Sequence, residues 1–258
     1  MAFCLVRAVV RTMCRILAVV PRGPLPPSLL RDFGVLATYG DVFPDENPGH
    51  HDGWGLAVAR GGAWEYLGRE PLSAAGSVAF AAAVERAQQG PPPEVLIAHL
   101  RAASQGKVTL ENTHPFLKEK WAFCHNGTIY GLKLPQPGMV GQTDSEWLMM
   151  EVLNEVGEGT PASEAFAATL RQVRARYPHS SLTSVLSDGR SLWVARVIGR
   201  SQTYTDEQLH SYYGMWHART ADSVMVCQQP LVGFDWVELD DSKLLEVRPD
   251  LTTSIEPI

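Results

Sequence analysis

Cysteine is scarce in this chain, and its four copies lie far apart. They are Cys4, Cys14, Cys124 and Cys227. No Cys-x-x-Cys pair and no Cys/His spacing typical of zinc ligands is present, so a zinc site and a redox dithiol have little support. His50 and His51 beside Asp52 do not suffice for a metal, because adjacent side chains rarely converge on one ion. We expect no metal ion and a reducing compartment.

Positive charge and long apolar runs are lacking too. The 22 Lys and Arg are outnumbered by 28 Asp and Glu, which gives a net charge of −6. Nucleic acids and acidic membranes attract clustered positive charge, and no basic stripe is present. No stretch approaches the ~18–20 apolar residues of a membrane span, and Arg7, Arg11 and Arg15 interrupt the first apolar run before the ~7–15 residues of a secretory signal. We expect a cytoplasmic protein with no nucleic-acid and no membrane partner.

Glycine patterns that bind dinucleotides or phosphates are absent, as is any repeated βα unit, so no cofactor is expected. The 258 residues are 45% hydrophobic and 19% charged, the balance of an ordinary globular domain. Apolar periodicity predicts an α+β protein in which helices cover sheets. The predicted helices are 29–36, 73–89, 144–156 and 163–177, and the predicted strands are 14–20, 55–59, 63–68, 94–99, 121–125, 182–186, 192–197, 212–218, 223–227 and 243–247. Strands 94–99 and 121–125 are expected to pair, and Thr160 or Ser163 to cap the last helix.

The segment Met13-Cys14-Arg15 reads like a second beginning of the chain. A cysteine at an amino terminus carries a nucleophile and a base in one residue, because its thiol lies within reach of its own α-amine. A free thiol has a pKa of about 8.5, whereas an α-amine near 7.7–8.0 accepts a proton at neutral pH. The alternative for Cys14 is a buried cysteine at the start of a strand.

Further polar motifs follow in a fixed order. They are His50 to Gly55, Ala98 to Ser104, Asn112 to Phe116, Phe123 to Ile129, and Thr143 to Glu146. Behind Met13-Cys14-Arg15, this series closely resembles the class II (N-terminal nucleophile) glutamine amidotransferase family, particularly its small stand-alone members. The resemblance is strongest from residue 13 to about residue 146. It implies the four-layer αββα sandwich of N-terminal nucleophile hydrolases.

The resemblance implies a role for three residues in splitting an amide. Cys14 would attack a glutamine carboxamide to give a thioester, with its α-amine accepting the thiol proton and later donating to departing ammonia. Asn126 and Gly127 would supply the oxyanion hole, where the loss of one donor typically costs ~10²–10³ in rate. The alternative for this pair is an ordinary Asn-Gly turn after a strand.

Four more residues are implied to bind the substrate. Arg101 would bind its α-carboxylate through the two-pronged guanidinium, and Asp144 would bind its α-ammonium. Asp144 also fits a helix N-terminus, and a surface position is the usual one for arginine. Ser104 would offer a hydroxyl, and Trp54 would form a wall of the site or else belong to the core.

His99 and His114 resemble family positions near the pocket, but we expect both to be buried structural histidines with satisfied hydrogen bonds.

Two segments depart from the family pattern. Well-studied amidotransferases often carry Arg-Trp-Ala-Thr-His where this chain has Arg101-Ala102-Ala103-Ser104-Gln105, which alters the loop expected to fold over glutamine. Cys227-Gln228-Gln229-Pro230-Leu231 stands where stand-alone members tend to have Ser-Glu-Pro-Leu. We assign the second segment no catalytic role.

The predicted organisation is a class II glutamine amidotransferase domain at 14–258 behind residues 1–13, which are a mis-assigned start or a removable propeptide. The predicted function is hydrolysis of glutamine or a γ-glutamyl amide through an N-terminal cysteine thioester. Any ammonia acceptor chemistry would then reside in a partner synthase subunit. The alternatives are another N-terminal nucleophile acylase, or a catalytically silent binding module of the same fold.

Overall fold

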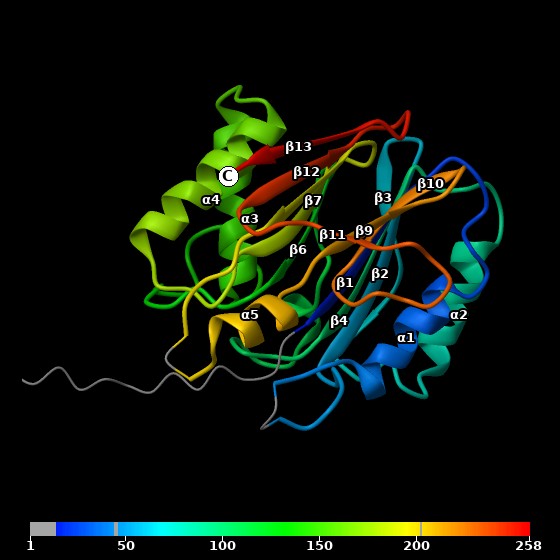
Figure 1. Ribbon diagram of the computed structural model, residues 1–258, viewed down its shortest axis with the longest axis horizontal. Coiled ribbons are helices and arrows are strands. Elements are labelled where there is room, and N and C mark those ends of the chain that lie inside the picture. The colour runs from blue at the N-terminus through cyan, green and yellow to red at the C-terminus, as the bar shows by residue number, and fades with distance from the viewer. Residues whose placement is uncertain (1–13, 44–45, 202) are drawn as a thin grey trace, which may run out of the picture.

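The computed structural model describes residues 14–43, 46–201 and 203–258 and places two antiparallel sheets face to face (Figure 1). The predicted start or propeptide at 1–13 lies outside the described residues. The first sheet has the order β11-β9-β10-β1-β4-β2-β3, and its strands are β1 (Arg15–Pro21), β2 (Gly53–Arg60), β3 (Ala63–Glu70), β4 (Val95–Arg101), β9 (Trp216–Arg219), β10 (Ser223–Cys227) and β11 (Val237–Glu238). The second sheet has the order β13-β12-β8-β7-β6-β5, and its strands are β5 (Phe116–Lys118), β6 (Trp121–Asn126), β7 (Thr183–Ser187), β8 (Leu192–Arg196), β12 (Lys243–Val247) and β13 (Thr253–Pro257).

Helices cover the outer face of each sheet. α1 (Leu29–Tyr39) and α2 (Val78–Gln88) pack on the first sheet, and α3 (Asp144–Gly157) and α4 (Ala162–Arg176) pack on the second, so that the two pairs lie on opposite sides in Figure 1. A short α5 (Asp206–Tyr212) and a 3₁₀ turn at Leu110–Asn112 lie in connections. The predicted α+β class and the four-layer αββα sandwich are confirmed.

The strand β1 shows how the layers are built. Ile16 and Ala18 face the core between the two sheets, whereas Leu17 and Val19 face the core beneath α1 and α2. Side chains of a strand alternate between its two faces, and here both faces are buried, so β1 reads as one continuous apolar run. The first residue before this run is Cys14, which is thereby held where the two sheets meet.

One predicted strand pairing is wrong. The strand predicted at 94–99 is β4, which pairs with β1 and β2, whereas the strand predicted at 121–125 is β6, which pairs with β5 and β7. They belong to different sheets. An apolar run shows that a strand is buried on both faces, but it does not specify the sheet that the strand joins.

Some predicted boundaries are also wrong. The helix predicted at 73–89 begins only at Val78, because the Ser77 side chain caps it by accepting from the Phe80 amide. The last of the predicted helices has Pro161 at its N-cap, and neither Thr160 nor Ser163 caps it. The first four of the seven residues predicted as a strand at 212–218 are wrong, since α5 extends to Tyr212 behind a capping box at Thr205 and β9 starts only at Trp216.

Candidate active site

Cys14 lies at the start of β1 and is only 8% exposed. Its backbone nitrogen donates to Asn126 Oδ1 at 3.1 Å, and its Sγ lies 3.6 Å from the Ala102 carbonyl oxygen. Burial raises the pKa of the Cys14 thiol to about 11. The thiol is therefore protonated at neutral pH, and it needs a base before it can attack a carbonyl.

Asn126 ends β6 and faces Cys14 across the gap between the sheets. Its Nδ2 donates to the Cys14 carbonyl at 2.9 Å and to Gln228 Oε1 at 3.0 Å. With Oδ1 on the Cys14 nitrogen, the carboxamide clamps both backbone polar groups of the cysteine. The fold thus joins two predicted site residues that are 112 positions apart in the chain.

Gly127 follows directly and occupies a position that no other residue fits. Its φ is +156°, and a Cβ there would lie 2.0 Å from the Ser181 carbonyl oxygen. Two hydrogen bonds hold the neighbouring His125 ring. Its Nε2 lies 3.1 Å from the Ser181 carbonyl oxygen, and its Nδ1 lies 2.9 Å from Ser145 Oγ. Burial lowers the pKa of His125 to about 4, so the ring is neutral, with its proton on Nε2 facing the carbonyl. This arrangement holds the Asn126-Gly127 turn against the second sheet.

Arg101 ends β4 and is 2% exposed. Its Nη1 and Nη2 donate to the carbonyls of Lys107 and Gln105, each at 3.1 Å. Burial lowers the pKa of Arg101, while the negative charge of Asp144 is among the effects that oppose this. The guanidinium fork is thus bound to the backbone of the loop that follows its own strand.

Asp144 is the first residue of α3, and Thr143 caps the helix by accepting from the Glu146 amide. The Asp144 carboxylate accepts from the Ile129 amide at 2.7 Å. Burial raises its pKa to about 6, against the lowering effects of backbone amides and of Arg101. Asp144 is therefore both a helix-start residue and a buried carboxylate beside Arg101.

One small cleft joins most of the predicted site residues. Cys14, Arg101, Ser104, Gly127 and Asp144 all line it, and its volume is about 20 Å³. Ser104 Oγ accepts from Thr128 Oγ1 at 2.7 Å, which ties the loop after β4 to the turn after β6. A space of this size holds about one water molecule. The site is closed in this conformation.

Trp54 does not join this cleft. Its ring packs edge-on against Phe80 of α2 with 5.2 Å between centroids, and its Nε1 donates to Glu70 Oε2 at 3.1 Å. Alternation along β2 turns Trp54 toward the helices, while Gly55 faces the site and lies so close to the His114 carbonyl that a Cβ would be 2.1 Å from it. The core alternative holds for this tryptophan, and its predicted role as a wall of the site is wrong.

His99 and His114 are buried as expected, and their rings stack with 4.3 Å between centroids. Among the described residues, neither ring nitrogen of either histidine has a hydrogen-bond partner, so the expectation of satisfied hydrogen bonds is wrong. Burial lowers both pKa values well below the usual range. Both rings are neutral, and His114 lines the cleft.

Sequence reasoning missed two residues of the site. Gln228 was assigned no role, yet it contacts Asn126, and Asp52 Oδ2 accepts from the Ala103 amide at 2.8 Å and thereby holds the loop after β4. The signal for Asp52 was its place in the motif before Gly53. Gln228 gave no local signal, because its contact depends on the pairing of β10 with β1.

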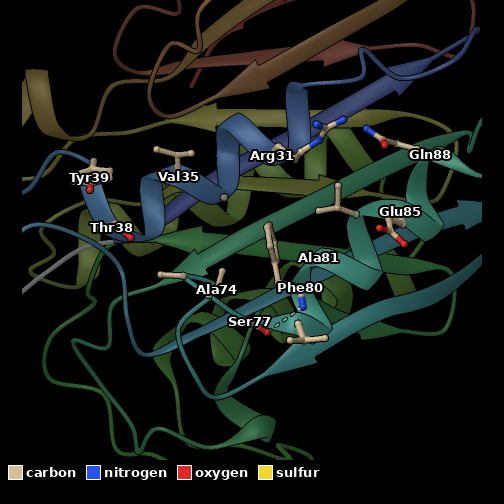
Figure 2. A pocket seen from close by; sticks show the side chains of 15 residues that line it. Arg31, Val35, Thr38, Tyr39, Ala74, Ser77, Phe80, Ala81, Glu85 and Gln88 are labelled. Carbon is tan, nitrogen blue, oxygen red and sulfur yellow. Dashed lines mark hydrogen bonds between the residues drawn. The ribbon is translucent and has the colours of Figure 1, made fainter.

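A larger hollow of about 780 Å³ lies between α1 and α2 (Figure 2). Val35 and Tyr39 of α1 and Phe80 and Ala81 of α2 are among its lining residues. Phe80 also contacts Trp54 edge-on, and both helices cover the face of the first sheet that is turned away from the second sheet. This larger hollow contains none of the predicted site residues.

No group of three or more His, Cys, Asp or Glu side chains in the described part of the chain could hold a metal ion. None of the described helices is long and apolar enough to cross a membrane.

Comparison with known proteins identifies the class of protein to which this αββα fold belongs. The family of class II glutamine amidotransferases matches residues 13–248, and the chain belongs to this family. YafJ of Escherichia coli K12, named provisionally as a glutamine amidotransferase, is 31% identical over 156 residues, or 55% of this chain and 58% of YafJ. A similarly named protein of Haemophilus influenzae is 36% identical over 107 residues, or 36% of each chain. The chain thus spans less than two thirds of the length of these curated relatives.

Solved structures show the same fold. A class II glutamine aminotransferase domain protein from Silicibacter pomeroyi aligns with a TM-score of 0.65 at 19% identity, over 95% of this chain and 99% of that one. The glutamine phosphoribosylpyrophosphate amidotransferase of Bacillus subtilis aligns with a TM-score of 0.63 at 12% identity, over 95% of this chain and 49% of that enzyme. The second alignment places the fold within part of a larger enzyme.

Proposed function

We propose that this chain hydrolyses the side-chain amide of glutamine or of another γ-glutamyl compound, with Cys14 as an N-terminal nucleophile. The observation that carries the proposal is the clamp of Asn126 on both backbone groups of Cys14, at 3.1 and 2.9 Å. It holds the cysteine nitrogen beside the thiol and a carboxamide donor beside the reacting atoms. The proposal includes maturation of the chain to begin at Cys14, since an amide nitrogen cannot act as a base.

The chemistry proceeds in two halves. The α-amine of Cys14 takes the thiol proton, and Sγ attacks the carboxamide carbon to give a tetrahedral oxyanion. Asn126 Nδ2–H and the Gly127 backbone N–H donate to that oxyanion. The C–N bond then breaks, the α-ammonium gives its proton to the leaving nitrogen as ammonia departs, and water hydrolyses the thioester to a γ-carboxylate.

The same cleft would recognise the glutamyl head group. Arg101 would bind the α-carboxylate and the ionised Asp144 the α-ammonium, with the Ser104 hydroxyl as a further polar contact. In the closed site, the carbonyls of Gln105 and Lys107 occupy the Arg101 fork. A carboxylate that replaces them must displace this loop, which would also widen the cleft of about 20 Å³.

We further propose a cytoplasmic location and, where ammonia is used for synthesis, an acceptor enzyme on a separate synthase subunit. Plain hydrolysis of a γ-glutamyl amide needs no such partner. The two cases differ in whether free ammonia or an aminated product is released.

A substrate panel tests the proposed function. Protein that begins at Cys14 is assayed for release of ammonia from glutamine, of the free amine from substituted γ-glutamyl amides, and of ammonia or amine from acyl amides without an α-amino acid head group, with the Cys14→Ala variant as the control. We expect turnover of the first two classes only. Equal turnover of the simple acyl amides would favour another N-terminal nucleophile acylase. An inert protein with a free Cys14 would favour the binding module.

A further inference from the structure

The Asn126 carboxamide can take only one orientation in its surroundings. The Cys14 nitrogen is a donor and must face Oδ1, and the Cys14 carbonyl is an acceptor and must face Nδ2. A flipped carboxamide would turn Nδ2 toward the Cys14 nitrogen, so that two donors face each other. It would also turn Oδ1 toward the Cys14 carbonyl, so that two acceptors face each other. The remaining Nδ2 hydrogen points to Gln228 Oε1 at 3.0 Å. Gln228 thus supplies the last hydrogen-bond partner of the Asn126 carboxamide.

Gln228 is held in place by the first sheet. It directly follows β10, and its amide donates to the Ile16 carbonyl at 3.1 Å, which extends the pairing of β10 with β1 by one residue. The side chain is 1% exposed. Gln228 therefore lies opposite Ile16, which is two residues after Cys14 in the chain. The side chain reaches Asn126 from a backbone position that the sheet holds fixed.

The amide end of Gln228 favours a specific role for this contact over packing alone. Its Oε1 must face the Asn126 donor, which leaves Nε2 buried without a hydrogen-bond partner among the described residues. A buried donor without a partner costs about 1–3 kcal/mol. An apolar side chain of this size would avoid that cost, but it would lose the acceptor.

We infer that Gln228 is a positioning residue, which fixes the Asn126 carboxamide for the reaction at Cys14. This inference rests on the proposed function for its kinetic part only. Gln228 accepts one Nδ2 hydrogen and thereby fixes the orientation of the carboxamide plane. The other hydrogen, which points to the Cys14 carbonyl, is thereby fixed in direction, and the oxyanion formed beside Cys14 would share it with that carbonyl while the carboxamide stays in place.

Exchange of the Asn126 side-chain hydrogens tests the positioning directly, without any need for activity. The chain has four asparagines, so selective ¹⁵N-asparagine labelling gives few side-chain signals, and the Asn126→Ala variant identifies the right one. We expect both Nδ2 hydrogens to exchange slowly in the native protein. Gln228→Leu should speed exchange of one of them by about tenfold or more, the effect of one buried hydrogen bond, and Gln228→Glu, which keeps an acceptor, should restore protection.

A matched control lies next in the chain. Gln229 Oε1 accepts from Arg15 Nε at 3.2 Å and from the Asp41 amide at 3.0 Å, so Gln229→Leu removes an acceptor from the same segment without touching Asn126. Because Arg15 Nη1 donates to the Cys14 carbonyl at 3.0 Å, this variant acts on Asn126 only through a second residue, and it should accelerate Asn126 exchange far less than Gln228→Leu does. Unchanged exchange in Gln228→Leu, or equal acceleration in Gln229→Leu, would overturn the inference.

Kinetics add a second test. Gln228→Leu should lower kcat by about 10–100-fold with KM unchanged, and it should have no further effect in an Asn126→Ala background. An equal fall of kcat in both backgrounds would show that Gln228 acts independently of Asn126, against the inference. If the exchange result holds but no glutamyl amide is split by the native protein, the proposed function fails and the positioning stands.

Discussion

At the scale of single residues, the Cys14 thiol is inert until a base acts on it. Burial raises its pKa to about 11, and its Sγ lies against the Ala102 carbonyl. Thiols in this state resist oxidation and alkylation, because the thiolate is the reactive form. The Asn126 clamp fixes the Cys14 nitrogen, which is the base in the proposed mechanism, so that mechanism requires this nitrogen to be a free amine.

Replacement of Cys14 should abolish turnover and spare the fold. Cys14→Ala and Cys14→Ser are expected to lose more than about 10³-fold in kcat, since removal of a nucleophile has effects of this size or larger. The serine variant fails because its hydroxyl is far less ionised than a thiol. Ammonia release and thermal melting measure the two properties. An active Cys14→Ala variant would contradict the assignment.

Charge recognition and oxyanion stabilisation should separate in steady-state kinetics. Arg101→Ala and Asp144→Ala are expected mainly to raise KM, because they meet charges present in the ground state. Asn126→Ala should lower kcat by about 10²–10³-fold with little change in KM, since it meets charge that develops only in the transition state. An unchanged KM for glutamyl substrates in both charge variants would mean that the pocket does not recognise the head group.

At the scale of elements, three strand ends and one helix start converge. Residues at the ends of β4 and β6, before β1 and at the beginning of α3 supply Arg101, Asn126, Cys14 and Asp144. Rigid elements thereby hold the residues of the proposed site, and the loop after β4 lines the cleft beside them. In the sequence, each of these positions is marked by a polar motif at the boundary of an apolar run.

Burial of the Asp144 carboxylate at the start of α3 should lower the free energy of unfolding by an amount that depends on pH. The folded pKa of Asp144 is about 6 against an ordinary value of 3.8, so the folded state binds more protons between these values and stability falls as pH rises through this window. Asp144→Asn, which keeps an acceptor for the Ile129 amide, should therefore raise the free energy of unfolding at pH 7–8 by up to roughly 3 kcal/mol.

Urea unfolding of both proteins from pH 3.5 to 8 measures this difference. The gap should shrink below pH 6 and vanish near pH 3.5, where the carboxyl is protonated in both states. A gap that is constant with pH would show that Asp144 ionisation is not its cause.

Sequence reasoning failed where pairing over long distances decides the structure. β4 and β6 are both short apolar runs, and nothing local shows that one joins β1 and the other β7. Gln228 escaped notice for the same reason. Trp54 lay within a recognised motif, but the alternation of β2 turned it toward α2 while Gly55 took the face toward the site.

At the scale of the whole molecule, the sandwich brings the two halves of the site together. The first sheet carries Cys14 and Arg101, the second carries Asn126, and α3 on the outer face of the second sheet supplies Asp144. Side chains between the sheets, such as Ile16, Ile97 and Val194, keep the two parts in register. Periodicity alone predicted only an α+β protein. The ordered series of polar motifs resembled a known family, and that resemblance predicted the four-layer sandwich.

The most direct test of the proposed function is a covalent label on protein purified from its own host. The protein is treated with an electrophilic glutamine analogue, and mass spectrometry then locates the adduct and reads the first residue of the active chain. We predict a single adduct on Cys14, in a peptide that begins with Cys14, while the buried Cys124 and Cys227 stay unlabelled. An active chain that still carries residues before Cys14, or an adduct on Cys124 in place of Cys14, would contradict the proposed mechanism.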